Sequence, residues 1–373
     1  MPVNAGDLAE MRNNLVLLAA GGTGGHLFPA EALAVALDKH GIAVDLATDT
    51  RAAHFRFPAR AVHLIPSATL RSRNPLGYAR TLALLGAGTT KALVLLGRVK
   101  PAVVVGFGGY PTVPPLYAAT LRGIPTVLHE QNGVMGRANR LLASRVTAIA
   151  TGFPEVTGLD SALRAKMTFT GNPVRPAVVS AAETPYPAPR ADGLLRITVF
   201  GGSQGARVMS DVVPEAIGRL APVLKARLAI TQQARGEDLE RVRAAYGRFG
   251  IAAETADFFA DLPARIAASH LIVSRSGAST VAELSAIGRP AIVVPLPHAL
   301  DQDQLANAGV LERAGAAIRI DQPSFTPERL AAEIAALASG PERLVRMAAA
   351  AKTAGTIDAA DRLADLVMKV AGI

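Results

Sequence analysis

The chain has 373 residues but no cysteine and no tryptophan, and only 4% of its residues are aromatic. Without cysteine it can form neither a disulfide framework nor a thiolate metal site. The scarcity of aromatic rings argues against base stacking on single-stranded nucleic acid. Basic residues outnumber acidic ones (39 against 30) but form no long run, so we expect a local basic patch and no nucleic-acid partner.

Long hydrophobic runs are also scarce. The longest, residues 82–99, is interrupted by two threonines, a lysine and an arginine, whereas a membrane span needs about 20 mostly apolar residues. The N-terminus lacks the basic region of a signal peptide, and the apolar run at residues 15–20 is too short to be the hydrophobic core of such a peptide. We therefore expect a soluble protein, with attachment to a membrane surface left open.

A short apolar strand, a glycine-rich turn and an apolar helix follow one another in both halves of the chain. In the first half, residues 15–20 precede the turn Gly21–His26 and a helix from about Phe28 to His40. In the second half, residues 195–200 precede the turn Gly201–Ala206 and a helix to about Leu220. Further strand-length apolar runs lie at residues 44–47, 102–105, 126–128, 148–150, 228–231, 271–274, 291–295 and 317–320. This alternation predicts an α/β protein with two Rossmann-like, doubly wound domains separated by a cleft.

A proline-rich connector, residues 183–189, follows the candidate junction at residues 172–176. We therefore expect an N-terminal domain of residues 1–173 and a C-terminal domain of residues 174–355. The alanine-rich end of the chain carries an apolar stripe between residues 357 and 370, which predicts a final helix.

Both glycine turns are candidate anion sites, because a helix N-terminus exposes backbone N–H groups and the positive end of the helix dipole. Neither has the spacing of a dinucleotide fingerprint, and neither carries the Lys-Ser/Thr of a P-loop. The alternative is a tight turn that only permits close helix–strand packing. His26, directly after the first turn, is either structural or a general base or phosphate donor.

Three further polar clusters follow predicted strands. Gly106–Thr112 is one of them. His129–Asn132 is expected to line the cleft, and the alternative is a loop with helix caps. In the third cluster, Ser274–Leu284, Glu283 could accept a ribose hydroxyl or simply complement its helix dipole. Asp301 and Asp303 lack a third carboxylate at suitable spacing, so we expect no metal site there.

Together these motifs resemble the MurG family, the UDP-N-acetylglucosamine:undecaprenyl-pyrophosphoryl-N-acetylmuramoyl-pentapeptide N-acetylglucosaminyltransferases. The resemblance runs from about Leu15 to the last helix and is specific because the motifs occur in the family's order. They are GGTGGH at 21–26, GFGGY at 106–110, HEQN at 129–132, GNPVR at 171–175, GGSQGAR at 201–207, SRSGASTVAEL at 274–284 and the region of Gln304 and Asn307.

The resemblance implies a GT-B glycosyltransferase fold, with the final helix, about residues 356–373, packing back on the N-terminal domain. It implies inverting transfer of N-acetylglucosamine from UDP-GlcNAc to the C4 hydroxyl of the MurNAc-pentapeptide of lipid I. The products are lipid II and UDP, the step belongs to peptidoglycan biosynthesis, and no cofactor or metal is needed. It also implies a peripheral position on the cytoplasmic face of the bacterial inner membrane, with cell-wall or division proteins as further partners.

The resemblance assigns site residues by motif position. The general base is left among His26, His129 and Glu130. In the C-terminal domain, Ser203 would contact the diphosphate, Glu283 the ribose and Gln304 the N-acetylglucosamine hydroxyls. The remaining implied donor or acceptor contacts are Thr23, Gly24, Gly25, Asn132, Arg175, Phe259 (backbone to uracil), Ala278, Ser279 and Thr280.

The basic excess suggests an anionic membrane surface as a partner. Six basic residues between Arg71 and Lys100 flank six leucines between Leu82 and Leu96, as in a helix that lies in a lipid interface. The alternative is an ordinary buried helix with solvated Arg and Lys side chains.

Three other functions compete with the transferase. A UDP-N-acetylglucosamine 2-epimerase has the same two-domain fold, and a non-catalytic nucleotide-sugar-binding protein would bind without turnover. A nicotinamide oxidoreductase is least favoured, since the fingerprint spacing is absent.

Overall fold

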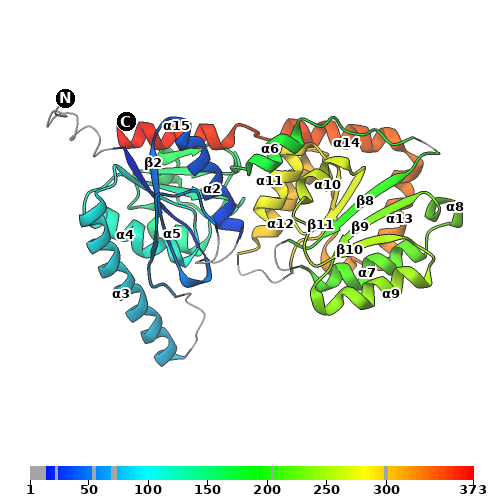
Figure 1. Ribbon diagram of the computed structural model, residues 1–373, viewed down its shortest axis with the longest axis horizontal. Helices are drawn as coiled ribbons and strands as arrows, with labels where there is room; N and C mark the ends of the chain where they lie inside the picture. Colours follow the sequence, from blue (N-terminus) through cyan, green and yellow to red (C-terminus); the bar gives the residue numbers. More distant parts are fainter. Residues whose placement is uncertain are drawn as a thin grey trace. The chain divides into compact units, whose positions relative to one another are not determined.

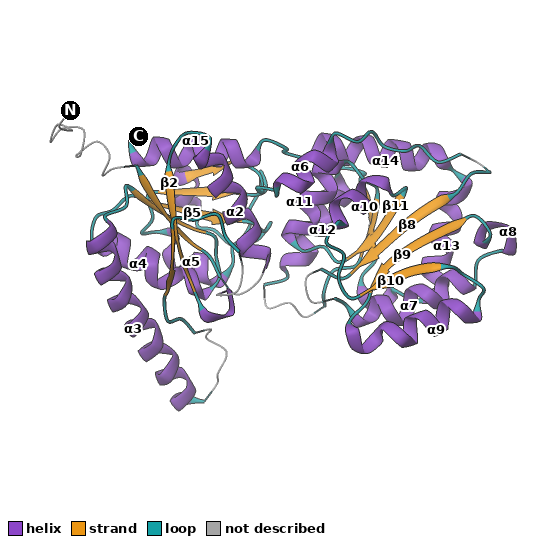
Figure 2. Ribbon diagram, in the orientation of Figure 1, coloured by secondary structure: helices purple, strands orange, loops and turns teal. Residues whose placement is uncertain are grey.

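The computed structural model describes residues 14–21, 24–52, 56–68, 74–190, 192–202, 205–297 and 301–373. The chain divides into two compact units. The N-terminal unit comprises Met1–Arg175 and Asp358–Ile373, and the C-terminal unit comprises Pro176–Ile357. Each unit is an α/β layer structure in which helices cover a central sheet (Figure 2).

The sheet of the N-terminal unit has seven strands in the order β3-β2-β1-β4-β5-β6-β7, and all of its pairings are parallel. The direction of winding, not of the strands, reverses between β1 and β4, and ligands bind at such a point in doubly wound sheets. The short strands β3 and β7 were not predicted, because neither is a continuous apolar run. The bounds are β1 Leu15–Ala19, β2 Ala43–Thr48, β3 Ala61–Leu64, β4 Val103–Gly106, β5 Thr126–Glu130, β6 Ala148–Thr151 and β7 Met167–Phe169.

Two helix layers bury this sheet. On one face, α2 (Gly24–Asp38) and the C-terminal helix α15 (Ala359–Ala371) pack against strand residues such as Val16 and Val105 (Figure 1). On the other face lie α3 (Pro75–Val99), α4 (Val113–Leu121) and α5 (Arg137–Ala143). The predicted start of the first helix, at Phe28, is wrong: the glycine turn runs directly into α2, which begins at Gly24.

Helix α3 also differs from the sequence-based expectation. Gly77–Val99 is long and apolar enough to cross a membrane by length and composition, and only 17% of its most apolar window is buried. Its threonines do not interrupt it, because the hydroxyls of Thr89 and Thr90 donate to the carbonyl oxygens of Leu85 and Gly86 at 2.8 and 3.1 Å. Figure 1 shows the first half of α3 extending beyond the rest of its unit.

The sheet of the C-terminal unit has six parallel strands in the order β10-β9-β8-β11-β12-β13. Its strands are β8 Leu195–Phe200, β9 Leu228–Gln233, β10 Ala253–Ala256, β11 Leu271–Ser274, β12 Ala291–Val293 and β13 Ala317–Arg319. The direction of winding reverses between β8 and β11, the strands that precede the second glycine turn and the SRSGAS motif. The helices are α6 Pro176–Ala182, α7 Arg207–Gly218, α8 Pro222–Lys225, α9 Leu239–Arg248, α10 Leu262–Ala268, α11 Ala278–Ile287, α12 Asp303–Arg313, α13 Pro327–Ser339 and α14 Pro341–Ala354.

A buried arginine ties three segments of this unit together. Arg289 is 2% exposed, and its guanidinium donates to the carbonyl oxygens of Ala267, Ile287, Thr184 and Pro185. The first two carbonyls lie at the C-termini of α10 and α11, where a cation complements the helix dipole. The other two belong to the proline-rich connector, which is thereby held against the unit.

Candidate active site

Gly21, the first residue of the first glycine turn, follows β1 in a space that admits no side chain. A Cβ atom at Gly21 would lie 3.0 Å from Pro111 Cβ and 3.1 Å from Thr48 Oγ1. Gly24 and Gly25 lie in the first turn of α2, where the positive end of the helix dipole favours an anion. Thr23, the first of the predicted contacts, lies outside the described residues.

His26 stands in the same helical turn, against the GFGGY segment. Gly108 and Gly109 adopt positive φ angles of 82° and 71°, and a Cβ at Gly109 would lie 3.4 Å from His26 Cε1. The imidazole Nδ1 is buried and has no hydrogen-bond partner among the described residues. Burial, with a smaller contribution from the charge of Arg51, lowers the pKa of His26 to about 4. The ring is therefore neutral near pH 7, the state that a general base needs, while burial also makes it less basic than a free imidazole.

His129, the second base candidate, is fully buried at the end of β5. Its Nε2 donates to the carbonyl oxygen of Gly171 at 3.1 Å, and its ring centroid lies 5.5 Å from that of Phe107. Burial lowers the pKa of His129 to about 4, against the opposing effect of the Gly171 hydrogen bond. The side chain is thus a neutral link between β5 and the GNPVR segment.

Glu130, the third candidate, is buried and uses both of its carboxylate oxygens. One accepts from the backbone N–H and side-chain amide of Asn132 at 2.9 and 3.1 Å. The other accepts from Gly136 N at 2.9 Å and Asn139 Nδ2 at 2.7 Å. Burial raises the pKa of Glu130, and these four donors oppose the rise. The carboxylate therefore shapes the loop that carries the predicted contact Asn132.

Arg175, the last residue of the N-terminal unit's first segment, lies over an aromatic ring of α2. Its guanidinium carbon is 4.1 Å from the centroid of Phe28, a cation–π contact. Its charge also opposes the rise in the pKa of Glu31 that burial causes. The GNPVR arginine is thus held beside the helix that follows the first glycine turn.

The second glycine turn, in the C-terminal unit, folds back on itself. A Cβ at Gly201 would lie 2.2 Å from Ala206 N, and Gly202 and Gly205 have positive φ angles of 82° and 65°. Only glycine meets these requirements without strain. Ser203, predicted to contact the diphosphate, lies outside the described residues.

Helix α11 begins beside this turn, at the reversal point of the sheet. Gly277 precedes it in an extended conformation without a side-chain cap, and Ala278, Ser279 and Thr280 form its first turn, at the positive end of the helix dipole. Glu283, one turn further on, is 7% exposed. The preceding loop is fixed in place, since Arg275 donates to the carbonyl oxygens of Val294 and Pro295 at 3.0 Å.

The last two predicted contacts are Phe259, in the loop between β10 and α10, and Gln304, in the first turn of α12. Phe259 is 8% exposed, and the guanidinium carbon of Arg265 lies 4.3 Å from its ring centroid. The side-chain oxygen of Gln304 accepts a hydrogen bond from the backbone N–H of Leu296 at 3.0 Å. Its backbone carbonyl oxygen accepts one from the Ser276 hydroxyl at 2.8 Å. Its amide oxygen and carbonyl oxygen are thus both engaged within the unit.

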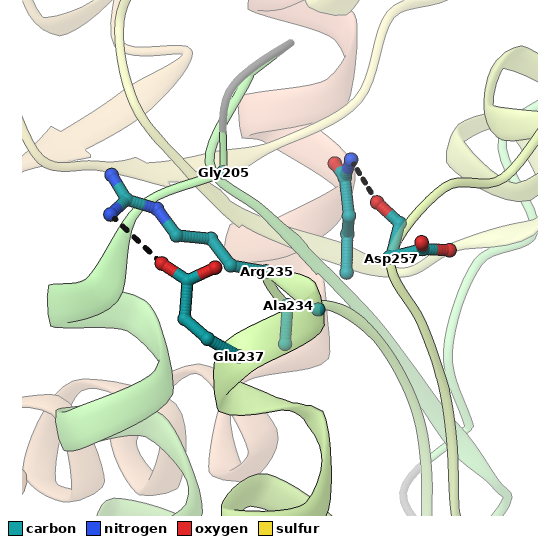
Figure 3. A pocket seen from close by; sticks show the side chains of 7 residues that line it. Gly205, Ala234, Arg235, Glu237 and Asp257 are labelled. Carbon is teal, nitrogen blue, oxygen red and sulfur yellow. Dashed lines mark hydrogen bonds and ion pairs between the residues drawn. The ribbon is translucent and has the colours of Figure 1, made fainter.

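An open pocket of about 430 Å³ follows β8, β9 and β10 at the carboxyl edge of the same sheet (Figure 3). Its lining includes Gly205, Gln233, Arg235, Glu237 and Asp257. The sequence-based predictions did not include Gln233 and Arg235. A signal was present, because polar residues directly follow the predicted strand 228–231, just as His129–Asn132 follow the predicted strand 126–128. In the described ranges, no three His, Asp or Glu side chains are grouped so as to hold a metal ion.

Comparison with known proteins identifies the chain. The N-terminal domain of glycosyltransferase family 28 matches residues 16–151, and the C-terminal domain of that family matches residues 196–363. A UDP-N-acetylglucosamine–N-acetylmuramyl-(pentapeptide) pyrophosphoryl-undecaprenol N-acetylglucosamine transferase of Rhodopseudomonas palustris (strain BisB18) is 63% identical over 96% of both chains. The transferase of the same name from Nitrobacter hamburgensis is 62% identical over 96% of this chain and 97% of that one. The chain belongs to the MurG family.

The solved structures agree with this membership. The crystal structure of Acinetobacter baumannii MurG is similar with a TM-score of 0.76 and 28% identity, over 95% of this chain and 99% of that one. The predicted GT-B glycosyltransferase fold is therefore confirmed. A UDP-GlcNAc 2-epimerase from Neisseria meningitidis gives a TM-score of 0.64 at 14% identity, over 95% and 100% of the two chains, and shares the fold alone. The chain is therefore a glycosyltransferase. The alternative of a UDP-GlcNAc 2-epimerase is supported by the shared fold alone.

Proposed function

We propose that this chain transfers N-acetylglucosamine from UDP-GlcNAc to the C4 hydroxyl of the MurNAc-pentapeptide of undecaprenyl-linked lipid I, giving lipid II and UDP. The observation that carries the proposal is the 63% identity, over 96% of both chains, to a transferase named for this reaction. Each unit also supplies a glycine turn and a helix N-terminus, which suits a reaction whose two substrates are both diphosphates.

The donor binds to the C-terminal unit in this proposal. The first-turn amides of α11 and the turn that contains Ser203 receive the diphosphate, Glu283 accepts the ribose hydroxyls, and the backbone of Phe259 meets the uracil. As the glycosidic bond breaks, negative charge develops on UDP. Backbone N–H groups and a helix dipole stabilise such charge without reorganisation.

His26 is the proposed general base in the N-terminal unit. Its side chain is partly exposed, whereas those of His129 and Glu130 are buried, and it is neutral at physiological pH. It removes the proton of the acceptor hydroxyl as an oxocarbenium-like charge develops at the donor's anomeric carbon. His129 and Glu130 are proposed as positioning residues, because their polar atoms are committed to Gly171 and to the Asn132 loop. Thr23, Gly24, Gly25, Asn132, Arg175 and Gln304 are proposed to complete the substrate contacts.

We also propose that α3 holds the enzyme on the cytoplasmic face of the inner membrane, where a lipid-linked acceptor lies. Tyr78, Leu82 and Val94 are each about half-exposed. Arg80, Lys91 and Arg98 are exposed on the same helix. An apolar helix with a basic rim binds at the interface of anionic lipids. Arg71 and Arg73, which were predicted to belong to this patch, lie outside the described residues.

The test measures UDP release from UDP-GlcNAc with and without a lipid I analogue. We expect acceptor-dependent release together with a β-1,4-linked disaccharide product. His26→Ala should lower kcat by about 100- to 10,000-fold while the KM for UDP-GlcNAc changes little. His40→Ala, which removes an exposed histidine just beyond α2, is the matched control and should behave like the unaltered chain.

Two results would contradict the proposal. UDP-GlcNAc binding without acceptor-dependent release would indicate a binding protein. Formation of UDP-ManNAc in the absence of acceptor would indicate an epimerase.

A further inference from the structure

The pocket after β9 contains an arginine that the proposed mechanism does not use. Arg235 follows the strand by two residues, and its side chain extends beneath Gly205 of the second glycine turn (Figure 3). Its Cγ and Nε would lie 2.8 and 3.8 Å from a Cβ at Gly205. Any side chain at position 205 would therefore displace Arg235, and the turn and the arginine form one packed unit.

The guanidinium of Arg235 is weakly held. Its Nε is buried and has no hydrogen-bond partner among the described residues. Its Nη1 lies 3.7 Å from Glu237 Oε1, beyond hydrogen-bond distance, and the side chain of Glu237 is 72% exposed. Exposed pairs of this kind contribute little to stability. The cation is thus available for a stronger anionic partner.

The position of Arg235 indicates which anion that is. Gly205 belongs both to the lining of the pocket and to the glycine turn, so the guanidinium stands beside the turn's backbone. That turn follows β8, one of the two strands at which the winding of the sheet reverses. Ligand phosphates bind at such a point. A guanidinium can donate two parallel hydrogen bonds to phosphate oxygens, whereas its present contact with Glu237 provides none.

We infer that Arg235 is a further donor-binding residue, whose guanidinium takes the diphosphate oxygens of the nucleotide sugar and leaves Glu237 when the donor binds. The inference rests on the proposed function, because it assigns a new residue to the same donor site. Gln233 supports the arrangement from the end of β9, since its amide nitrogen donates to the carbonyl oxygen of Asp257 at 2.9 Å and so joins the ends of β9 and β10.

The test separates charge from packing. Arg235→Met keeps an unbranched stem against Gly205 but has no guanidinium, whereas Arg235→Ala removes both. UDP affinity is measured by calorimetry on the full chain, and uridine affinity by competition. We expect both variants to bind UDP about 10- to 100-fold more weakly, as for loss of a charge-assisted hydrogen bond, and uridine as tightly as the unaltered chain. Equal melting temperatures would show that both variants are folded.

Glu237→Gln is the matched control. It removes the competing carboxylate and should bind UDP at least as tightly as the unaltered chain. Retention of UDP affinity in Arg235→Met but not in Arg235→Ala would mean that the stem only supports the turn, and would overturn the inference. Weakened binding in Glu237→Gln equal to that in Arg235→Met would overturn it as well. Failure of the unaltered chain to bind UDP would instead overturn the proposed function, and this inference with it.

Discussion

His129 donates a hydrogen bond from Nε2 to the carbonyl oxygen of Gly171 across 3.1 Å. The contact joins the end of β5 to the segment just beyond β7, the last strand of the N-terminal sheet. Gly171 has a φ of 82°, which suits glycine, and Asn172 beside it donates through Nδ2 to the carbonyl oxygen of Gln131 at 2.8 Å. The HEQN and GNPVR motifs are therefore parts of one hydrogen-bonded structure.

The neutral state of His129 makes stability depend on pH. Folding lowers its pKa to about 4, while the unfolded chain protonates histidine near its ordinary value of about 6.5. Between these values the unfolded state binds more protons, so this contribution is complete above about pH 6.5 and is lost as the pH falls toward 4. We expect the free energy of unfolding to fall by about 1.4 kcal/mol per pH unit for each such histidine.

His129→Gln tests this dependence by denaturant unfolding at several pH values. The glutamine amide can still donate to Gly171 but does not titrate, so the slope between pH 4 and 6.5 should become shallower. His40→Gln, at an exposed site, should leave the slope unchanged. An unaltered slope in His129→Gln would contradict the assignment.

Glu130→Gln should weaken the loop that carries Asn132. The carboxylate accepts four hydrogen bonds, whereas an amide offers one oxygen and turns an NH₂ group toward N–H donors. We expect a loss of about 1–3 kcal/mol in the free energy of unfolding, and a lower kcat/KM. Glu328→Gln, an exposed site, is the control and should be close to neutral. Full activity in Glu130→Gln would exclude the positioning role.

Gly106→Ala should destabilise the N-terminal unit, because the added Cβ would lie 2.3 Å from Thr112 Cγ2 and 2.4 Å from Leu116 Cδ1. Overpacking of this kind costs about 1–3 kcal/mol. The same change at Gly86 meets no atom within 4 Å and lies in helix α3, so it should be neutral or stabilise by up to about 1 kcal/mol. Thermal unfolding of the two variants gives the comparison, and equal effects would contradict it.

Removing the basic rim of α3 should weaken membrane binding. We expect Arg80→Gln, Lys91→Gln and Arg98→Gln together to lower affinity for anionic vesicles by about 100-fold or more, at about 1 kcal/mol per charge. The control is a second triple variant that removes the same charge from exposed sites of the C-terminal unit: Arg219→Gln, Arg243→Gln and Arg329→Gln. Co-sedimentation should separate the two triple variants. Equal losses would attribute binding to net charge alone.

The periodicity of the chain predicted much of the architecture. Continuous apolar runs bounded by glycine or proline marked most of the buried parallel strands, because a strand covered on both faces must be apolar throughout. The order of the motifs indicated the family, and the family comparisons confirm it. Periodicity did not reveal the short strands β3, β7 and β10 or the start of α2 at Gly24, since pairing with a neighbouring strand and packing of the turn decide them.

Residue types alone could not separate the three base candidates or find Arg235. His26, His129 and Glu130 each follow a predicted apolar strand or a glycine turn, yet tertiary packing buries two of them and ties their polar atoms to backbone groups of other segments. Arg235 comes next to Gly205 only because parallel pairing sets the end of β9 beside the end of β8. The order of amino acids fixes which chemistry-bearing residues exist and which strands they follow. Folding in three dimensions selects which of them are buried and which contact one another, because burial and hydrogen bonding depend on neighbours that are remote in the chain.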